Sequence, residues 1–391
     1  MEQSRLKGTL PFPSIRTQLL IISLVVLIIP WVGVQTLRDM EQLLRQQQVE
    51  NVMTSATTIL NGLSSVMPMI DRHNRQAAIT PAESEIVLSD FTTPVTIDGY
   101  ADDWPEERIR QEYNLQNALQ DGNNNSRISF TLSSVRQHGK LILLLDVDDD
   151  VLYQTPNPLS QPHNGDRVLL GLADEQARIQ QRYVISSNSP GWLRVTPLQD
   201  PARHETRIQA ELQVRSGGYT IEIALPDYLS TRHMAVQLID RDDNDPANYA
   251  VIGNTPVAPA VGGLVFSQYS DLIRMTDAYR APGQAIRIVD RRGYVLATTL
   301  EEQLTHDGSQ DTEDDFASRI LQILILADTI TGDDEMRPFR MRQKHVLNAL
   351  NNQSDYLFYR DANGRGYLSV AVPLIINNVA AGALILQQST D

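Results

Sequence analysis

The chain has 391 residues, of which 41% are hydrophobic and 21% charged, so it is long enough for two or three folded domains. Its formal net charge of -15 argues against nucleic acid or an anionic membrane surface as a partner, because like charges repel. It contains no cysteine, which excludes disulfides, thiolate metal sites and thiol nucleophiles.

An almost unbroken apolar run, Thr17 to Val34, lies close to the N-terminus. Continued to Leu37, it predicts a transmembrane helix over residues 17–37, since about 20 apolar residues cross a hydrocarbon core of about 30 Å. Basic residues outnumber acids before it, so the positive-inside rule predicts that residues 1–16 are cytoplasmic. We therefore expect a bacterial inner-membrane protein with its bulk in the periplasm. The alternative is a cleaved secretory signal, which also exports the remainder.

Residues 38–70 predict a juxtamembrane signalling helix, because they are rich in Gln, Glu, Leu and Met. Its apolar residues recur at alternating steps of three and four: Val49, Val52, Ala56, Ile59, Leu63, Val66 and Ile70. This spacing is typical of a coiled-coil seam and predicts a homodimer. The alternative is a helix that packs on its own domain. An earlier trio, Leu37, Met40 and Leu44, is out of phase with the seam.

Residues 91–255 predict an all-β sandwich. Short apolar or β-branched runs are separated by Gly, Asn, Asp and Pro clusters, with little helical periodicity between them. The first predicted strand is Val95 to Ile97, ending in a turn at Asp98-Gly99. The later ones are Lys140 to Val147, Arg167 to Leu172, Gln181 to Ser186, Tyr219 to Leu225 and Met234 to Ile239.

Residues 264–391 predict an α+β domain. A helix over Leu264 to Tyr279 precedes a hairpin with its turn at Asp290 and Gly293. A second helix with apolar positions from Phe316 to Ala327 follows an acidic opening. Three strands close the chain: Tyr356 to Arg360, Tyr367 to Pro373 and Ala380 to Leu386, the last two joined by a turn at Asn377-Asn378.

Two acidic stretches predict a calcium-binding site, because hard cations bind several oxygen ligands from short loops. The candidate ligands are Asp148, Asp149, Asp240, Asp242 and Asp243. The second stretch is not an EF-hand, since it lacks that loop's glycine and closing glutamate. The alternative is that both stretches are solvated loops of an acidic protein.

No catalytic motif stands out. The sequence has no Walker loop, no His-Glu-x-x-His, no Gly-x-Ser-x-Gly and no dinucleotide fingerprint. The seven histidines are scattered, with no pair at metal-ligand spacing. We therefore expect no catalytic residue in this chain.

Landmarks within the predicted sandwich resemble the family-nine carbohydrate-binding modules. They are Ile97-Asp98-Gly99, Asp102-Asp103-Trp104, Asp146 to Asp150, Gly165 to Val168, Tyr219 to Pro226 and Asp240 to Asp243. The resemblance implies that aromatic side chains stack on sugars and that acidic loops hold calcium. The tryptophans that can serve as ligand-binding platforms are Trp104 and Trp192, and Trp104 occupies the place of the family's structural tryptophan.

The C-terminal pattern is similar to PAS-like, Cache-type sensor domains, through Ile288-Val289-Asp290, Gly293 to Ala297, Val370 to Leu374 and Gly382 to Leu386. The whole order resembles the sensor half of the histidine kinases of the proteobacterial dedicated sortase system. The residues behind this likeness are Ile29 to Gly33, Arg38 to Gln46 and Gly382 to Asp391.

The resemblance implies the extracytoplasmic sensor portion of a two-component histidine kinase, with a response regulator as its partner and ATP bound only by a kinase domain absent from these residues. A second hypothesis is a membrane-anchored periplasmic carbohydrate-binding protein without signalling output. A third is the input half of a chemoreceptor or of a cyclic-dinucleotide enzyme.

Overall fold

The computed structural model describes residues 15–81, 83–115, 127–154, 164–186, 189–230, 232–242, 249–256, 260–299, 330–331, 336–337, 339–360 and 365–390. The chain divides into two units, one of residues 1–55 with 305–330 and one of residues 56–304 with 331–391.

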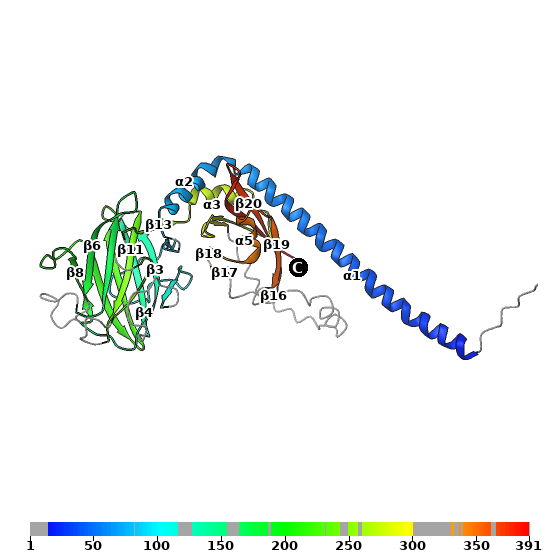
Figure 1. Cartoon of the computed structure of the whole chain (residues 1–391), viewed down its shortest axis with the longest axis horizontal. Coiled ribbons are helices and arrows are strands. Elements are labelled where there is room, and N and C mark those ends of the chain that lie inside the picture. The colour runs from blue at the N-terminus through cyan, green and yellow to red at the C-terminus, as the bar shows by residue number, and fades with distance from the viewer. Residues whose placement is uncertain are drawn as a thin grey trace, which may run out of the picture. The chain divides into compact units, whose positions relative to one another are not determined.

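Helix α1 (Ile15–Gly62) begins the described chain (Figure 1). The predicted transmembrane span, residues 17–37, lies within it, although most of that span's side chains are outside the described residues. In the described part of the chain, no helix is both long and apolar enough to cross a membrane.

The predicted helix over residues 38–70 is broken. Helix α1 ends at Gly62, the 3₁₀ turn η1 (Ser64–Val66) follows, and α2 (Met67–Ala78) begins with Pro68 in its first turn. Proline is tolerated there because the first amide groups of a helix need no intrahelical acceptor, whereas glycine in a helix interior is unfavourable. A break between Gly62 and Pro68 follows from these two residues.

The predicted seam is buried within the single chain. In the larger unit its members are at most 7% exposed: Ala56, Ile59, Leu63, Val66 and Ile70. A Cβ added to Gly62 would lie 2.4 Å from the hydroxyl of Tyr279, so this glycine permits a close approach. The helix thus packs on its own domain, which is the alternative to a seam between two chains. The out-of-phase trio of Leu37, Met40 and Leu44 is exposed.

Two β-sheets of the larger unit pack face to face as a sandwich (Figure 1). In the described residues, one sheet has the order β1-β13-β11-β5-β6-β8 with β12 beside β11, and the other β2-β3-β4-β10-β9-β7. The first contains β1 (Ile86–Leu88), β5 (Arg167–Ala173), β6 (Ile179–Ser186), β8 (Arg194–Pro197), β11 (His233–Asp240), β12 (Ala250–Gly253) and β13 (Gly263–Ser267). The second contains β2 (Gln111–Asn114), β3 (Ser129–Gln137), β4 (Lys140–Asp148), β7 (Gly191–Trp192), β9 (Gln209–Arg215) and β10 (Gly218–Pro226).

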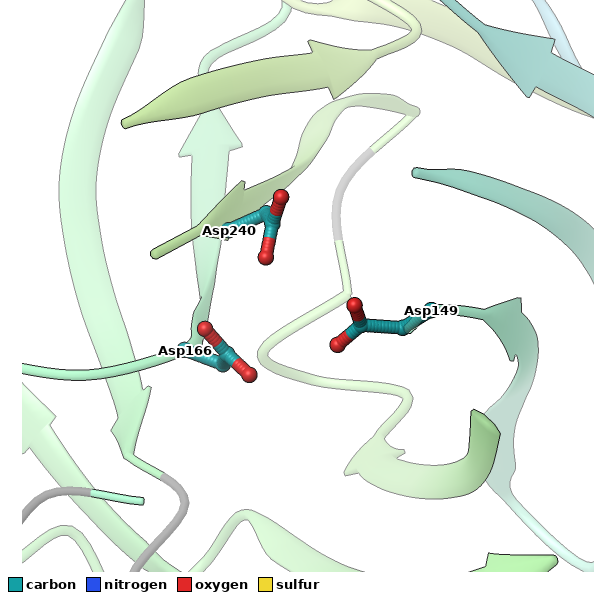
Figure 2. A group of neighbouring side chains, drawn as sticks. All are labelled: Asp149, Asp166 and Asp240. Carbon is teal, nitrogen blue, oxygen red and sulfur yellow. The ribbon is translucent and has the colours of Figure 1, made fainter. Parts of the chain in front are cut away.

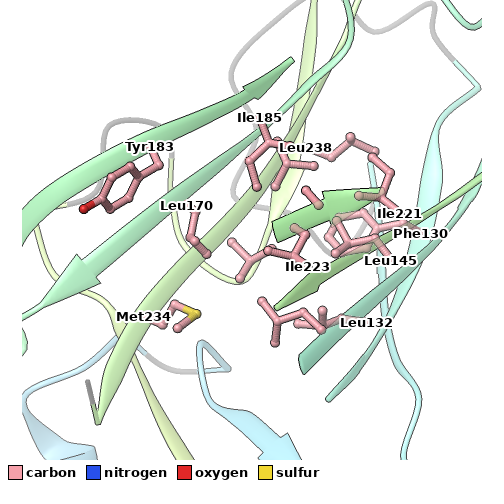
Figure 3. Close-up of a cluster of buried hydrophobic side chains, with 14 of the residues drawn as sticks. Phe130, Leu132, Leu145, Leu170, Tyr183, Ile185, Ile221, Ile223, Met234 and Leu238 are labelled. Atoms are coloured by element: carbon pink, nitrogen blue, oxygen red, sulfur yellow. The ribbon is translucent and has the colours of Figure 1, made fainter. Parts of the chain in front are cut away.

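The core between the sheets is built from alternating apolar side chains. Figure 3 shows Phe130 and Leu145 from one sheet facing Leu170, Ile185 and Leu238 from the other. Burial of this apolar surface is the main force that holds the sheets together, at about 25 cal/mol per Å². Since β1 and β13 also belong to the sandwich, it extends on both sides of the predicted range 91–255.

Strand β4 is apolar on both faces, which the sequence KLILLLDV already shows. Leu143 and Leu145 point into the core between the sheets, whereas Ile142 and Leu144 pack against Trp104 on the opposite face. That face is covered by the segment from Phe91 to Trp104. The predicted strand over residues 95–97 is wrong, because this segment has no strand in the structure.

An antiparallel sheet with helices forms the C-terminal part, so this is an α+β unit. Its described strands have the order β15-β14-β21-β20-β19-β16, with a separate pair β17-β18. The elements are α3 (Ser270–Asp277), β14 (Gln284–Asp290), β15 (Val295–Thr299), β16 (Ile330–Thr331), β17 (Met336–Arg337), β18 (Arg340–Met341), α5 (Lys344–Leu350), β19 (Asp355–Arg360), β20 (Gly366–Ile376) and β21 (Val379–Ser389).

The predicted hairpin and the closing strands are confirmed by this sheet. Gly293 has φ +85° at the hairpin turn, and Asn377 and Asn378 have φ of 52° and 63° at the β20–β21 turn. Asparagine and glycine tolerate this left-handed region better than other residues. The predicted helix over 264–279 is wrong in its first part, which is strand β13. The predicted helix from Phe316 to Ala327 lies outside the described residues.

A buried junction fixes α2 and the segment after it to the β14–β15 turn. The Nε2 atom of His73 lies 3.2 Å from the carboxylate of Asp290, and both side chains are fully buried. Arg292 donates hydrogen bonds to the carbonyl groups of Thr80 (2.9 Å) and Pro81 (3.2 Å) and pairs with the buried carboxylate of Glu85. Glu85 immediately precedes β1, so these contacts connect the α+β part to the edge of the sandwich.

Candidate functional site

Three buried aspartates meet at one end of the sandwich. Asp240 ends β11, and Asp166 immediately precedes β5; because Ile239 pairs with Arg167 in antiparallel register, these aspartates lie side by side. Asp149 follows β4 in the facing sheet. Carboxylate oxygens of the three lie within 4.8 Å of one another, and Figure 2 shows the carboxyl groups converging on one space.

Burial and neighbouring negative charges raise the pKa of carboxyl groups in this cluster. Asp166 is 1% exposed, and its pKa is raised to about 9, first by burial and then by the negative charges of Asp240 and Asp149. Burial also raises the pKa of Asp149, with Asp150 and Asp242 adding to the effect. Like charges in a low-dielectric interior repel strongly, so the cluster either retains a proton or binds a positive ion.

Backbone hydrogen bonds orient the carboxylates. Asp166 accepts the N–H groups of Arg241 at 2.8 Å and Tyr153 at 2.9 Å. One oxygen of Asp149 accepts the N–H of Val151 at 3.0 Å. The side chains are therefore held in place by main chain, and a bound ion would find its ligands already positioned.

Two buried oxygen atoms at the cluster have no hydrogen-bond partner among the described residues. They are Oδ2 of Asp149 and the hydroxyl of Tyr219. Tyr219 is completely buried, and its pKa is raised first by burial and then by the charges of Asp166, Asp149 and Asp240. An oxygen-rich set of this kind suits a hard cation such as Ca²⁺ or Mg²⁺.

A second group shares Asp149. Its carboxylate oxygens lie within 4.8 Å of those of Asp150 and Asp242, which are more exposed than the first cluster. The carboxylates of the two groups come from both sheets: from the end of β4 in one sheet, and from the start of β5 and the end of β11 in the other. The residues that could hold a cation are thus Asp149, Asp166 and Asp240, with Asp150 and Asp242 at the outer side.

Of the five predicted metal ligands, Asp149, Asp240 and Asp242 come together here. Asp148 instead pairs with Arg215 at 2.5 Å, and Asp243 lies outside the described residues. The sequence prediction missed Asp166. Its signal was the position of an aspartate directly before a buried strand, but only the pairing of β5 with β11 brings it beside Asp240.

Trp104 is placed in the core rather than on a binding surface. It is 4% exposed, its indole N–H donates to Glu222 at 2.7 Å, and its ring meets Phe91 edge to face. Glu222 also accepts the N–H groups of Asp98 and Gly99. Because Trp104 offers no open ring face, it does not fit the predicted ligand-binding role; it anchors the covering segment instead.

Trp192 is a solvent-exposed tryptophan on edge strand β7. Its side chain is 62% exposed, and its backbone pairs with Glu211 of β9. An exposed indole next to polar groups can stack on an apolar sugar face while hydrogen bonds form around it. Of the two predicted platforms, Trp192 is the one whose surroundings allow stacking.

Comparisons with known proteins find limited likeness. No protein-family model matches the chain, and no curated protein matches it. Two solved structures of a family-nine carbohydrate-binding module from Caldicellulosiruptor kristjanssonii, with cellotriose and with glucose, are 18% identical at a TM-score of 0.35; each covers 48% of this chain and 96% or 97% of its own. The ligand-binding domain of the Campylobacter jejuni chemoreceptor Tlp3, in complex with L-valine, is 11% identical at a TM-score of 0.20 and covers 89% of this chain and 95% of its own. TM-scores of this size do not establish a shared fold.

Glu222→Gln should remove a pH dependence of stability. Burial raises the pKa of Glu222 to about 7, above its unfolded value of 4.5, so the folded state favours the protonated form. The contribution of Glu222 to stability is therefore greatest below about pH 4.5 and falls as pH rises through 7. Urea denaturation between pH 4 and pH 8 should show a smaller decline in the variant than in the wild type. An unchanged decline would contradict this assignment.

Proposed function

We propose that this chain is the sensory portion of a membrane-anchored receptor, with a sandwich module that binds a divalent cation, calcium in the first instance. The observation that supports the cation site is the set of three buried carboxylates, those of Asp149, Asp166 and Asp240, within 4.8 Å. Burying three like charges together is costly unless a proton or a cation offsets them. Isothermal titration of the full chain with Ca²⁺ and Mg²⁺ tests the site; no binding of either ion would overturn it.

The junction supports a sensor rather than a passive tether. The His73–Asp290 and Arg292–Glu85 contacts are buried and link the edge of the sandwich to the α+β part. A ligand-driven change in one part can therefore bias the other, which a flexible linker would not allow.

We further propose that residues 17–37 cross the bacterial inner membrane, with residues 1–16 in the cytoplasm and the bulk in the periplasm.

The output follows from the resemblance to histidine kinases of the dedicated sortase system. In such a receptor, the kinase and ATP-binding domains lie outside these residues, and phosphate passes to a response regulator. The C-terminal α+β part would serve as a PAS-like or Cache-like sensor domain, and the full receptor would act as a homodimer. Protease added to spheroplasts should cleave the sandwich, whereas protease added to intact cells should leave it uncleaved. If the sandwich is not cleaved in spheroplasts either, the proposed topology is contradicted.

A second candidate function is a membrane-anchored carbohydrate-binding protein without signalling output. The exposure of Trp192 favours it, because an open indole on an edge strand is available for stacking on sugars. This candidate shares the anchor and the sandwich with the receptor and differs in having no coupled response.

Trp192→Ala should weaken glycan binding about five- to thirtyfold, since a stacked aromatic ring contributes about 1–2 kcal/mol. A glycan array of cell-surface oligosaccharides, probed with the full chain, measures this. Tyr228→Ala is the matched control, because Tyr228 is a 73% exposed aromatic residue of the same sandwich. Equal glycan binding by the wild type and W192A would show that Trp192 does not contribute to the glycan-binding site.

A further inference from the structure

The exposed tryptophan of the sandwich has a glutamate as its cross-strand neighbour. Strands β7 and β9 are antiparallel, and Trp192 is opposite Glu211. One residue further along, the N–H of Leu193 donates to the carbonyl of Ala210 at 2.8 Å, so the pair before it has no hydrogen bonds between its own backbone groups. The Cα atoms of such a pair are about 4.5 Å apart, and their side chains project from the same face. The indole and the carboxylate therefore leave the sheet side by side.

Two glutamates are neighbours on this face of the sheet, and they differ in their partners. Glu222 of β10 is opposite Glu211. Its carboxylate accepts three N–H groups at 2.7, 2.9 and 2.8 Å, from the indole of Trp104 and the main chain of Asp98 and Gly99. Of the residues that the structure describes, none donates a hydrogen bond to the carboxylate of Glu211 or forms an ion pair with it. Glu222 thus holds the covering segment in place, whereas Glu211 is available to a ligand.

The surroundings of Glu211 favour a positive charge. Its side chain is only partly buried, so solvent and ligands can reach it. Its pKa is raised, first by burial and then by the negative charge of Asp98, and no cation in the described part of the chain lowers it. A positively charged group beside Glu211 would offset both effects. The formal net charge of -15 also attracts cations to the surface of this protein.

The ring of Trp192 adds a second preference for cations. Its side chain is 62% exposed, and no aromatic ring or cation among the described residues stacks on it. Strand β7 ends its sheet in the described part of the chain, so no further strand covers the indole from that side. The face of an indole attracts ammonium groups through its quadrupole, and it also packs against the apolar face of a sugar ring. Trp192 and Glu211 therefore offer two different contacts to one ligand.

We propose that Trp192 and Glu211 together bind an amino sugar in its ammonium form, with the sugar ring on the indole and the ammonium group at the carboxylate. This inference rests on the second candidate function, carbohydrate binding, and specifies the class of sugar. Because the two residues are about 4.5 Å apart at their Cα atoms, a single monosaccharide unit can reach both side chains. An ammonium group adds an ion pair to its hydrogen bond with Glu211, whereas a hydroxyl group of a neutral sugar supplies the hydrogen bond alone.

The test is isothermal titration of the purified full chain at pH 6 with the trisaccharides of glucosamine, glucose and N-acetylglucosamine. At this pH the amino groups of glucosamine are protonated, whereas the other two ligands are neutral. The wild type should bind the glucosamine trisaccharide about five- to tenfold more tightly than either neutral one. Glu211→Gln should remove that preference. Glu175→Gln, at an exposed position of the other sheet, is the matched control and should keep it.

The outcomes separate this inference from carbohydrate binding itself. Equal binding of all three ligands by the wild type, or tighter binding of a neutral one, would overturn the amino-sugar preference and leave carbohydrate binding in place. No binding of any of the three would contradict both. A preference that E211Q retains would show that the ammonium group binds elsewhere on the acidic surface, which overturns the role of Glu211. The melting temperature of E211Q should match that of the wild type, because a partly exposed side chain without described partners is replaced by one of the same size.

Discussion

Asp149→Asn should increase the free energy of unfolding of the metal-free chain at pH 8 by about 1–3 kcal/mol and weaken calcium binding at least about tenfold. The remaining oxygen of the amide can keep the hydrogen bond from the N–H of Val151. The new amide group replaces an oxygen that has no partner among the described residues, and it removes a carboxyl charge beside Asp166 and Asp240. Urea denaturation in a chelator and isothermal titration with Ca²⁺ measure the two effects.

The pH dependence of the metal-free chain gives an independent check on the same cluster. The pKa of Asp166, raised to about 9, lies above its unfolded value of 3.8, so stability should fall as pH rises between these values. Saturating calcium should reduce this fall, because the ion favours the ionised form. Asp200→Asn, at an exposed position of the sandwich, is the control and should change neither quantity. A less stable D149N at pH 8 would contradict the proposed repulsion.

His73→Ala should lower the free energy of unfolding by about 3 kcal/mol or more. The substitution removes the 3.2 Å contact with the carboxylate of Asp290 and the 3.0 Å hydrogen bond with the hydroxyl of Tyr269. It also leaves a cavity beside the ring of Phe266 and a buried carboxylate with fewer partners. Urea denaturation at pH 7 measures the loss.

The matched control for the junction is Arg75→Ala on the same helix. Arg75 pairs with Asp71 at 2.9 Å, but its side chain is 72% exposed, and exposed pairs contribute little. We expect a change below about 0.5 kcal/mol. Similar losses for H73A and R75A would mean that helix propensity, rather than the buried contact, determines the effect.

Local patterns were sufficient for the C-terminal strands. The Asp290–Gly293 turn and the Asn377-Asn378 turn each join two apolar runs, and both hairpins form where these residues predict them. The seam from Ala56 to Ile70 was also visible as a buried stripe. Spacing alone did not reveal whether it packs on its own chain or on a second one, because both arrangements require the same apolar face.

The failures come from contacts between residues far apart in sequence. The segment at Val95 to Ile97 has a strand-like composition. Its Val95 and Thr96 N–H groups, however, donate to the side chains of Gln137 and Asp103 instead of to a neighbouring strand. Asp166 was missed for a similar reason, since its place beside Asp240 depends on the order of strands in the sheet. Neither fact is encoded in local periodicity.

The parallel pairing of β1 with β13 has a consequence for how the protein is assembled. The chain enters the sandwich through β1 and leaves it through β13, two adjacent strands that run in the same direction. Helix α2 lies just before this entrance and α3 just after the exit, and α2 contacts β14 and β21 whereas α3 contacts β15. The sandwich is therefore an insertion in a discontinuous domain. The first helix of that domain, α2, is separated from its sheet by residues 79–283, which must fold so that their two ends lie close together.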